Sequence, residues 1–197
     1  MTKIIPALFL ILLFSGRNVS AQEKMTPDRF REIAAMPGDD VPLDSQFAMN
    51  RPYWPKTKWS VSLTDWSYTG TNVEGKTVRD EGTTVARTVR GKYIVSTVQS
   101  RLRGVETFIT TNDAKPGTFH VYRFIEPAGV LTVATYVNDP QKKTFSGVEE
   151  RGNGVKALNN GSYTDKVCKQ KVMIYQDDVL IMTQEFTLTP DPGDDTK

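Results

Sequence analysis

The chain has 197 residues, with 25 Lys or Arg, 23 Asp or Glu, one His and one Cys. A formal net charge of +2 without any Lys/Arg-rich block argues against nucleic acid as a partner. One Cys cannot form an intramolecular disulfide, and one His with one Cys cannot supply a zinc site from nitrogen and sulfur ligands alone. We therefore expect neither a metal nor a cofactor.

Residues 1–21 have the layout of a secretory signal peptide, with Lys3, an apolar run at 4–14 and the small-residue pattern at 19–21. The alternative is a membrane anchor, but the run is shorter than the roughly 20 residues that span a bilayer. We expect cleavage near Ala21, a periplasmic or secreted protein, and no membrane span. The leader carries two basic residues and no acidic residue, so the remaining chain has equal numbers of basic and acidic residues.

Residues 22–58 are predicted to form a short helix followed by an extended arm. In MTPDRFREIAAMPG, Thr26 is suited to the N-cap and Pro27 to the first helical position, while Pro37-Gly38 ends the helix. Further prolines favour extended backbone up to residue 58. The arm also holds aromatic side chains, which predicts that it is ordered.

Residues 59–189 alternate apolar and polar side chains with a period of two and are predicted to form one β domain. About ten strands without a long helix indicate an antiparallel barrel or sandwich, and the short connections favour an up-and-down barrel. Residues 190–197 are predicted to be a polar tail. The candidate strands are Trp59 to Leu63, 77–90, 92–101, 105–111, 118–126, 130–137, 143–150, 167–176, 179–189 and a weaker one at 155–164, which Asn160-Gly161 could break.

Several of these strands are apolar on both faces. In KYIVSTV, Tyr93 and Val95 lie on one side and Ile94 and Val98 on the other. A barrel with a helix or arm packed outside it, or with a lined cavity inside it, explains this pattern. A sandwich with a small second layer explains it as well. We expect residues 87–111 to form adjacent antiparallel strands in the wall of a barrel.

Two short motifs resemble those of a known group of proteins. RTVRGKYIVS at 87–96 and YVNDPQKKTFSGV at 136–148 are similar to bacterial exported domains of unknown function whose fold is lipocalin-like. The resemblance covers Trp59 to Thr189 and implies a lipocalin-like barrel there. It implies no activity.

Arg123 is the most informative candidate for binding because it interrupts an apolar strand face formed with Phe119, Val121 and Ile125. A charge there must pair, reach water or contact an anionic group. Gln184 similarly interrupts the face of Leu180, Met182, Phe186 and Leu188. If both faces point into one cavity, these residues are polar points in an apolar pocket. The alternatives are an internal ion pair or a strand face that has been assigned to the wrong side.

Four further residues complete the predicted ligand-binding set, and no catalytic set is predicted. Tyr93 and Tyr122 lie on strand faces, His120 shares a face with Tyr122, and Trp66 either covers an opening or marks a bend. As alternatives, His120 is an ordinary strand histidine or a haem ligand. Cys168 is a buried small residue, or it forms an intermolecular bridge or is a reactive thiol. Glu149 and Glu150 project to opposite faces, which argues against a cooperating acid pair.

These observations predict a non-enzymatic, exported β-barrel that binds or shields a small apolar or amphiphilic ligand. The alternative is a structural or protein-interaction domain with a filled core, whose Trp66, Tyr68 and Tyr53-Trp54 contact a partner. An enzyme that uses Arg123 and tyrosines is a third class. A lined void of roughly several hundred cubic ångströms favours ligand binding. In that case we expect Arg123→Met to weaken binding of an anionic amphiphile and to spare the fold.

Overall fold

A computed structural model of the chain describes residues 24–39, 53–69, 72–112, 115, 117–125 and 129–192. The predicted signal peptide and most of the predicted tail lie outside the described residues. One helix, α1 (Pro27–Ala35), precedes ten strands in this part of the chain. The protein is therefore mainly β, as the period-two pattern predicts.

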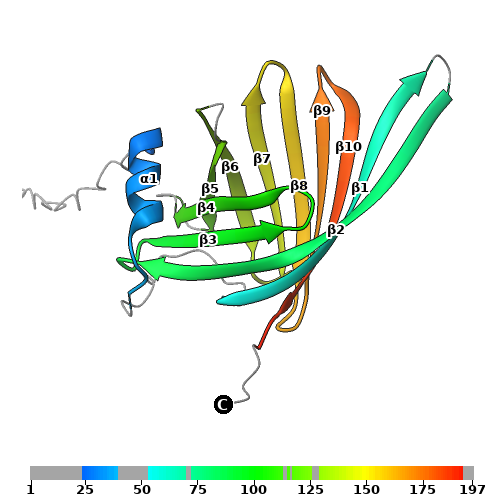
Figure 1. Cartoon of the computed structure of the whole chain (residues 1–197). Coiled ribbons are helices and arrows are strands. Elements are labelled where there is room, and N and C mark those ends of the chain that lie inside the picture. Colours follow the sequence, from blue (N-terminus) through cyan, green and yellow to red (C-terminus); the bar gives the residue numbers. More distant parts are fainter. Residues whose placement is uncertain are drawn as a thin grey trace, which may run out of the picture.

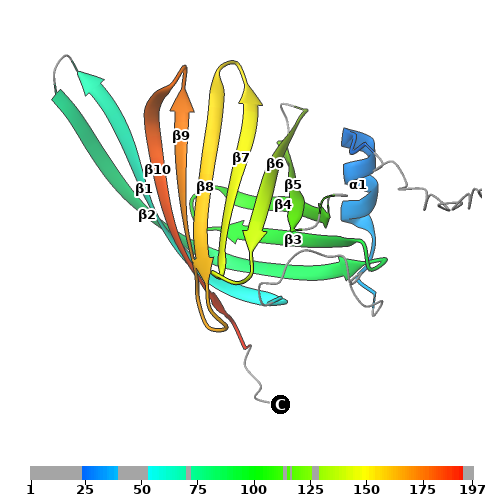
Figure 2. The same cartoon turned by 180° about the vertical axis from the view of Figure 1, so that it is seen from behind.

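The ten strands form one closed antiparallel barrel in which each strand pairs with its neighbours in the sequence, and β1 pairs with β10 to close the ring. Figures 1 and 2 show the two sides of this wall. The predicted up-and-down barrel is thus confirmed. The strands are β1 (Lys56–Thr69), β2 (Asn72–Val89), β3 (Tyr93–Ser100), β4 (Gly104–Asn112), β5 (Thr118–Ile125), β6 (Val130–Asp139), β7 (Thr144–Gly152), β8 (Val155–Tyr163), β9 (Cys168–Gln176) and β10 (Val179–Pro190).

Most predicted strands match the observed ones within a few residues, because turn-forming residues separate them. The turn after β2 places Arg90 and Gly91 at positive φ, a conformation that glycine adopts readily. The weaker candidate at 155–164 is one unbroken strand, β8. Its Gly161 does not end the strand, since it pairs directly with Phe145 of β7.

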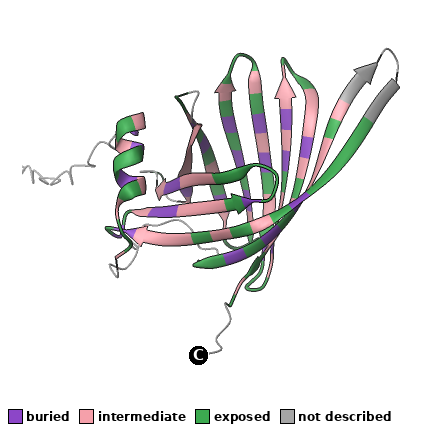
Figure 3. Ribbon diagram, viewed as in Figure 1, coloured by how far each residue is buried: buried purple, intermediate pink, exposed green. Residues whose placement is uncertain are grey.

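The β1–β2 hairpin is longer than predicted and projects beyond its neighbours (Figure 1). β1 pairs with β2 without a register shift over its whole length, whereas the ladder to β10 ends at Asp65. On the other side, β3 pairs with β2 only from Gly82 onward. Most of the described residues of β2 outside this pairing are exposed (Figure 3).

Helix α1 packs against the outside of the barrel and not within it (Figure 1). Thr26 is the N-cap, and its side-chain oxygen accepts a hydrogen bond from the backbone N–H of Arg29 at 3.2 Å. Pro27 occupies the first turn, where the backbone N–H that proline lacks would have no partner within the helix. The predicted helix and its cap are confirmed.

The face of α1 that covers the barrel forms a dry apolar cluster. Ile33 is completely buried and packs with Val95 and Ile109, which are also completely buried, on β3 and β4. Arg87 of β2 ties the end of the helix to the wall, donating to the carbonyls of Ala34 at 2.5 Å and Met36 at 3.1 Å. Such donors satisfy carbonyls that the last helical turn leaves unpaired. This outer cluster explains why β3 is apolar on both faces.

A second apolar cluster lies among the strands at the start of β7 and β9. Phe145, Tyr163 and Cys168 are buried there, and Trp54 and Leu188 pack against them. Cys168 is only 1% exposed, which agrees with its interpretation as a buried small residue.

Candidate functional site

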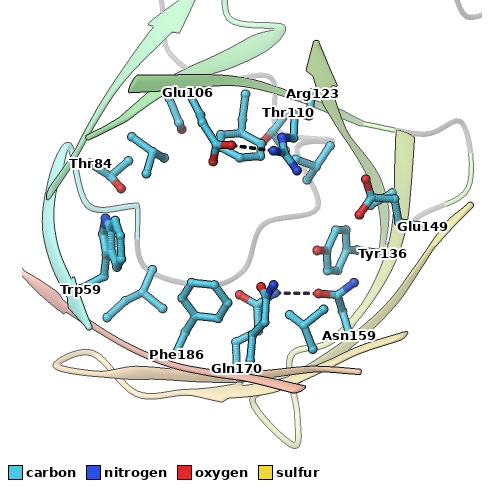
Figure 4. A pocket seen from close by; sticks show the side chains of 18 of the residues that line it. Trp59, Thr84, Glu106, Thr110, Arg123, Tyr136, Glu149, Asn159, Gln170 and Phe186 are labelled. Atoms are coloured by element: carbon cyan, nitrogen blue, oxygen red, sulfur yellow. Dashed lines mark hydrogen bonds and ion pairs between the residues drawn. The ribbon is translucent and has the colours of Figure 1, made fainter. Parts of the chain in front are cut away.

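The interior of the barrel holds a lined cavity of about 280 Å³ that is partly open to the outside, and all ten strands contribute side chains to it (Figure 4). This volume lies just below the range of small-molecule sites, which begins at about 300 Å³. The apolar lining consists of Trp59, Val98, Phe108, Phe119, Val121, Ala134, Tyr136, Phe145, Val172, Phe186 and Leu188. The polar lining consists of Thr84, Ser96, Arg103, Glu106, Thr110, Arg123, Glu149, Arg151, Asn159, Gln170 and Gln184.

Three aromatic rings of the lining lie over glycines on the neighbouring strand. The ring of Trp59 lies so close to Gly82 that a Cβ at that glycine would collide with it and with the backbone oxygen of Gln99. A side chain on the glycine would push such a ring away from the wall and into the interior, so the glycines help to keep the cavity open. The cross-strand pairs are Trp59 with Gly82, Tyr136 with Gly147, and Phe145 with Gly161.

A series of ion pairs runs along one side of the cavity, and Figure 4 shows its pair of Arg123 and Glu106. Arg123 of β5 donates to Glu106 of β4 at 2.5 Å. The other oxygen of Glu106 lies 3.8 Å from Arg103 in the β3–β4 turn, and Arg103 lies 3.7 Å from Asp80 of β2. The positive charge of Arg123 is therefore already matched by a carboxylate inside the barrel.

Asp80 lies at one end of this series of ion pairs. It is only 2% exposed, and every contact that it makes stabilises its charge. Its carboxylate accepts hydrogen bonds from the Ser100 hydroxyl at 2.6 Å and from the backbone N–H groups of Glu81 and Leu102. Burial alone would raise the pKa of Asp80, but these hydrogen bonds and the Arg103 charge outweigh it and lower the pKa below its usual value. Asp80 thereby holds the β3–β4 turn and positions Arg103.

Two more polar pairs line the cavity. Glu149 accepts a hydrogen bond from Arg151 at 2.8 Å, and Gln170 donates to Asn159 at 2.9 Å (Figure 4 draws the second pair). Two buried donors in the lining have no hydrogen-bond partner among the described residues, namely Nε1 of Trp59 and Nε of Arg151. Each of these two atoms has less than 1 Å² of exposed surface, so neither can be reached from the cavity without a movement of the side chains around it.

The cavity lies close to a groove on the outer surface. The groove lies beside α1, where Phe30, Arg31 and Ala34 face β4 and β5. Arg103, Glu106 and Arg123 line both the groove and the cavity. These three charged side chains therefore lie between the interior and the surface.

Of the six predicted ligand-binding residues, the structure places Arg123 and Gln184 in the cavity. The predicted alternative for Arg123, an internal ion pair, is also present. Nε2 of Gln184 lies 3.3 Å from the sulfur of Met182. The predicted inward face of β10 includes one error: a register shift between Leu180 and Met182 turns Leu180 to the outer surface.

The other four predicted residues are not part of the cavity lining. Tyr93 and Tyr122 pack against the cluster under α1. Nδ1 of His120 lies 3.1 Å from the Thr135 hydroxyl, and the imidazole is 6.1 Å from the Tyr122 ring. Trp66 lies in a surface groove and donates from Nε1 to the Thr183 hydroxyl at 3.2 Å.

Sequence reasoning missed several polar residues of the cavity, above all Glu106, Glu149 and Arg151. A usable signal was present for two of them, since Glu149 and Arg151 are opposite charges two residues apart and so share a strand face. Glu106 shares a face with Phe108 and Thr110 in the same way. In the part of the chain that the structure describes, no group of three or more His, Cys, Asp or Glu is placed to hold a metal ion. No described helix has the length and apolarity needed to span a membrane.

Comparisons with known proteins assign neither a family nor an activity to this chain. The resemblance of residues 87–96 and 136–148 to lipocalin-like exported domains therefore remains an expectation. The fold and the cavity are the observations from which a function can be argued. No protein-family model matches the chain, and a search of curated proteins found no match either.

Proposed function

We propose that this protein is exported and that it binds or shields a small apolar or amphiphilic ligand inside its barrel, without catalysis. The observation that carries the proposal is the lined cavity of about 280 Å³. Its aromatic and aliphatic walls suit an apolar ligand body, and its polar groups suit a fixed orientation of that ligand. The layout of residues 1–21 supports export, and the closed antiparallel barrel is compatible with a lipocalin-like family.

The main alternative is a structural or protein-interaction domain with a filled core. The open interior argues against it. Two of the aromatic residues expected at a partner surface also have contacts within the chain, since Trp54 packs against the cluster of Phe145 and Tyr163, and Trp66 donates to Thr183. The ligand-binding proposal therefore accounts for more of the structure.

A cavity-filling substitution tests the proposal. Ala134 is 6% exposed and lines the cavity, whereas its neighbour Val133 is 38% exposed on the other face of β6. Ala134→Phe should abolish binding of a neutral apolar fluorescent probe such as phenylnaphthylamine, because the added ring occupies the cavity. Val133→Phe is the matched control and should bind the probe like the unaltered protein.

Native mass spectrometry of protein purified without denaturant supplies the second test. We expect a co-purifying small molecule in the unaltered protein and in Val133→Phe but not in Ala134→Phe. Thermal unfolding of both variants checks that they are folded. If the unaltered protein carries no molecule and binds no probe, the filled-core alternative is favoured instead.

A further inference from the structure

We infer that the cavity takes an amphiphile with one negative charge, whose carboxylate binds the guanidinium of Arg103 where the cavity meets the groove beside α1. The inference rests on the proposed binding function and adds the chemical class of the ligand and the position of its charged end. Three observations carry it: the surplus of one arginine in the cavity lining, the unused donors of Arg103 and the location of this side chain.

The cavity lining carries one more arginine than it has glutamates. Arg123 donates to Glu106 at 2.5 Å, and Arg151 donates to Glu149 at 2.8 Å. Each glutamate of the lining therefore has its own hydrogen-bonded arginine, and Arg103 is the third cation. A surplus of one positive charge favours a ligand with one negative charge over an uncharged ligand.

The guanidinium of Arg103 makes no hydrogen bond to any described residue. Its Nε lies 3.7 Å from Asp80 and its Nη1 lies 3.8 Å from Glu106, and both distances exceed those of hydrogen bonds. Asp80 is buried, does not line the cavity and accepts its hydrogen bonds from Ser100 and two backbone N–H groups instead. The planar N–H donors of Arg103 are therefore available, and their geometry suits the two oxygens of a carboxylate.

Arg103 lies where a charged group and an apolar group can both be accommodated. It lines the cavity and the groove, and its side chain is 33% exposed. A carboxylate bound there keeps part of its hydration, which reduces the cost of burying a charge. The guanidinium lies 6.0 Å from the ring of Trp59, which belongs to the apolar lining. The apolar body of the ligand can therefore lie in the cavity while its charged end contacts Arg103.

Three ligands with similar alkyl chains test the preference for a negative charge: decanoate, decanol and decyltrimethylammonium. Isothermal titration calorimetry of the unaltered protein at neutral pH measures their affinities. We expect decanoate to bind about tenfold more tightly than decanol, because hydrogen bonds to a charged group supply such a ratio. Decyltrimethylammonium should bind most weakly. A decanoate affinity equal to or below that of decanol would overturn the inference.

A matched pair of arginine substitutions tests the position of the charged end. Arg103→Met keeps the apolar stem beside Trp59 and removes the donors, so it should weaken decanoate about tenfold and leave decanol unchanged. Arg101→Met makes the same change of charge in the same turn. Arg101 is exposed and lines neither the cavity nor the groove, so this control should alter neither affinity. Thermal unfolding checks that both variants are folded.

A glutamate substitution tests the same contact in the opposite direction. Glu106→Gln removes the negative charge 3.8 Å from Arg103 and keeps an oxygen that can accept from Arg123. It should strengthen decanoate about fivefold and leave decanol unchanged, since it removes a repulsion between two carboxylates. Glu185→Gln makes the same change of charge on the outer surface, where Glu185 pairs with Lys171, and should alter neither affinity. An unchanged decanoate affinity in Glu106→Gln would overturn the inference, even if Arg103→Met does not fold.

The results separate this inference from the proposed function. If Arg103→Met weakens decanoate and decanol equally, or if Arg101→Met weakens decanoate as much, the inference is overturned while the cavity still binds ligands. The same holds if phenylnaphthylamine binds and decanoate does not. If neither phenylnaphthylamine nor any of the three alkyl ligands binds, the inference fails together with the proposed function.

Discussion

The apolar layer outside the barrel, under α1, and the interior of the barrel differ in how they are packed. Outside, Ile33, Val95 and Ile109 are completely buried in a dry cluster. Inside, apolar rings share the wall with paired charges around an open cavity. This difference indicates that a hollow barrel can gain stability from its outer surface. A helix packed there buries apolar side chains, whereas a hollow interior buries fewer of them.

Removing the helix contact should have the largest effect on stability. Ile33→Ala deletes a fully buried side chain between α1 and the barrel, and it should lower the free energy of unfolding by about 3 kcal/mol. Urea unfolding followed by circular dichroism measures the change. A loss below about 1 kcal/mol would contradict the view that this layer stabilises the barrel.

Neutralising the buried carboxylate of Asp80, which holds the β3–β4 turn, should have the next largest effect. Asp80→Asn should lower the free energy of unfolding by about 2 to 3 kcal/mol at neutral pH, since it removes a charge held by Ser100, Arg103 and two backbone N–H groups. It should also allow the β3–β4 turn to move.

The effect of Asp80 should depend on pH. Since the folded state lowers the pKa of Asp80, its carboxylate stabilises the fold above its unfolded pKa of about 3.9, and this stability is lost as the pH falls through the folded pKa. The difference between Asp80→Asn and the unaltered protein should therefore shrink as the pH falls below about 5. Urea unfolding at several pH values measures it. An unchanged difference would show that the charge of Asp80 is not what stabilises the turn.

A matched pair of substitutions compares the two regions directly. Val95 lies in the outer cluster and Val172 lines the cavity, and both are buried. Val95→Ala should cost about 2 kcal/mol and Val172→Ala about 1 kcal/mol, because a truncation beside an existing cavity loses fewer packing contacts. Chemical denaturation of both variants measures the difference. Equal costs would mean that the interior is packed as tightly as the outer layer.

Removing the helix cap should have the smallest effect. Thr26→Ala leaves the backbone N–H of Arg29 without its side-chain acceptor and should cost about 1 kcal/mol. Hydrogen exchange should accelerate at the first turn of α1 and stay unchanged in β8 and β9, which contribute no residue to the cluster under α1. Faster exchange throughout the barrel would show that the helix and the barrel unfold as one unit.

The fold was more predictable than the site. Strand positions and the N-cap at Thr26 follow from neighbouring residues, which is why they were found. Arg123 and Gln184 were correctly predicted to line a cavity, because alternation along a strand identifies which side chains share a face. Tyr93 and Tyr122 were expected to contact a ligand, but they pack under α1, because an apolar face suits a helix as well as a cavity.

The sequence by itself determined the elements of this protein: a capped helix and about ten strands with short turns, which together favour an up-and-down barrel. These depend on local periodicity and turn chemistry. Only the tertiary structure decided that Glu106 pairs with Arg123, that Trp59 lies over Gly82 and that α1 covers the outside. Such contacts depend on the strand register and on barrel closure, which bring together side chains whose spacing along the chain carries no signal of their contact.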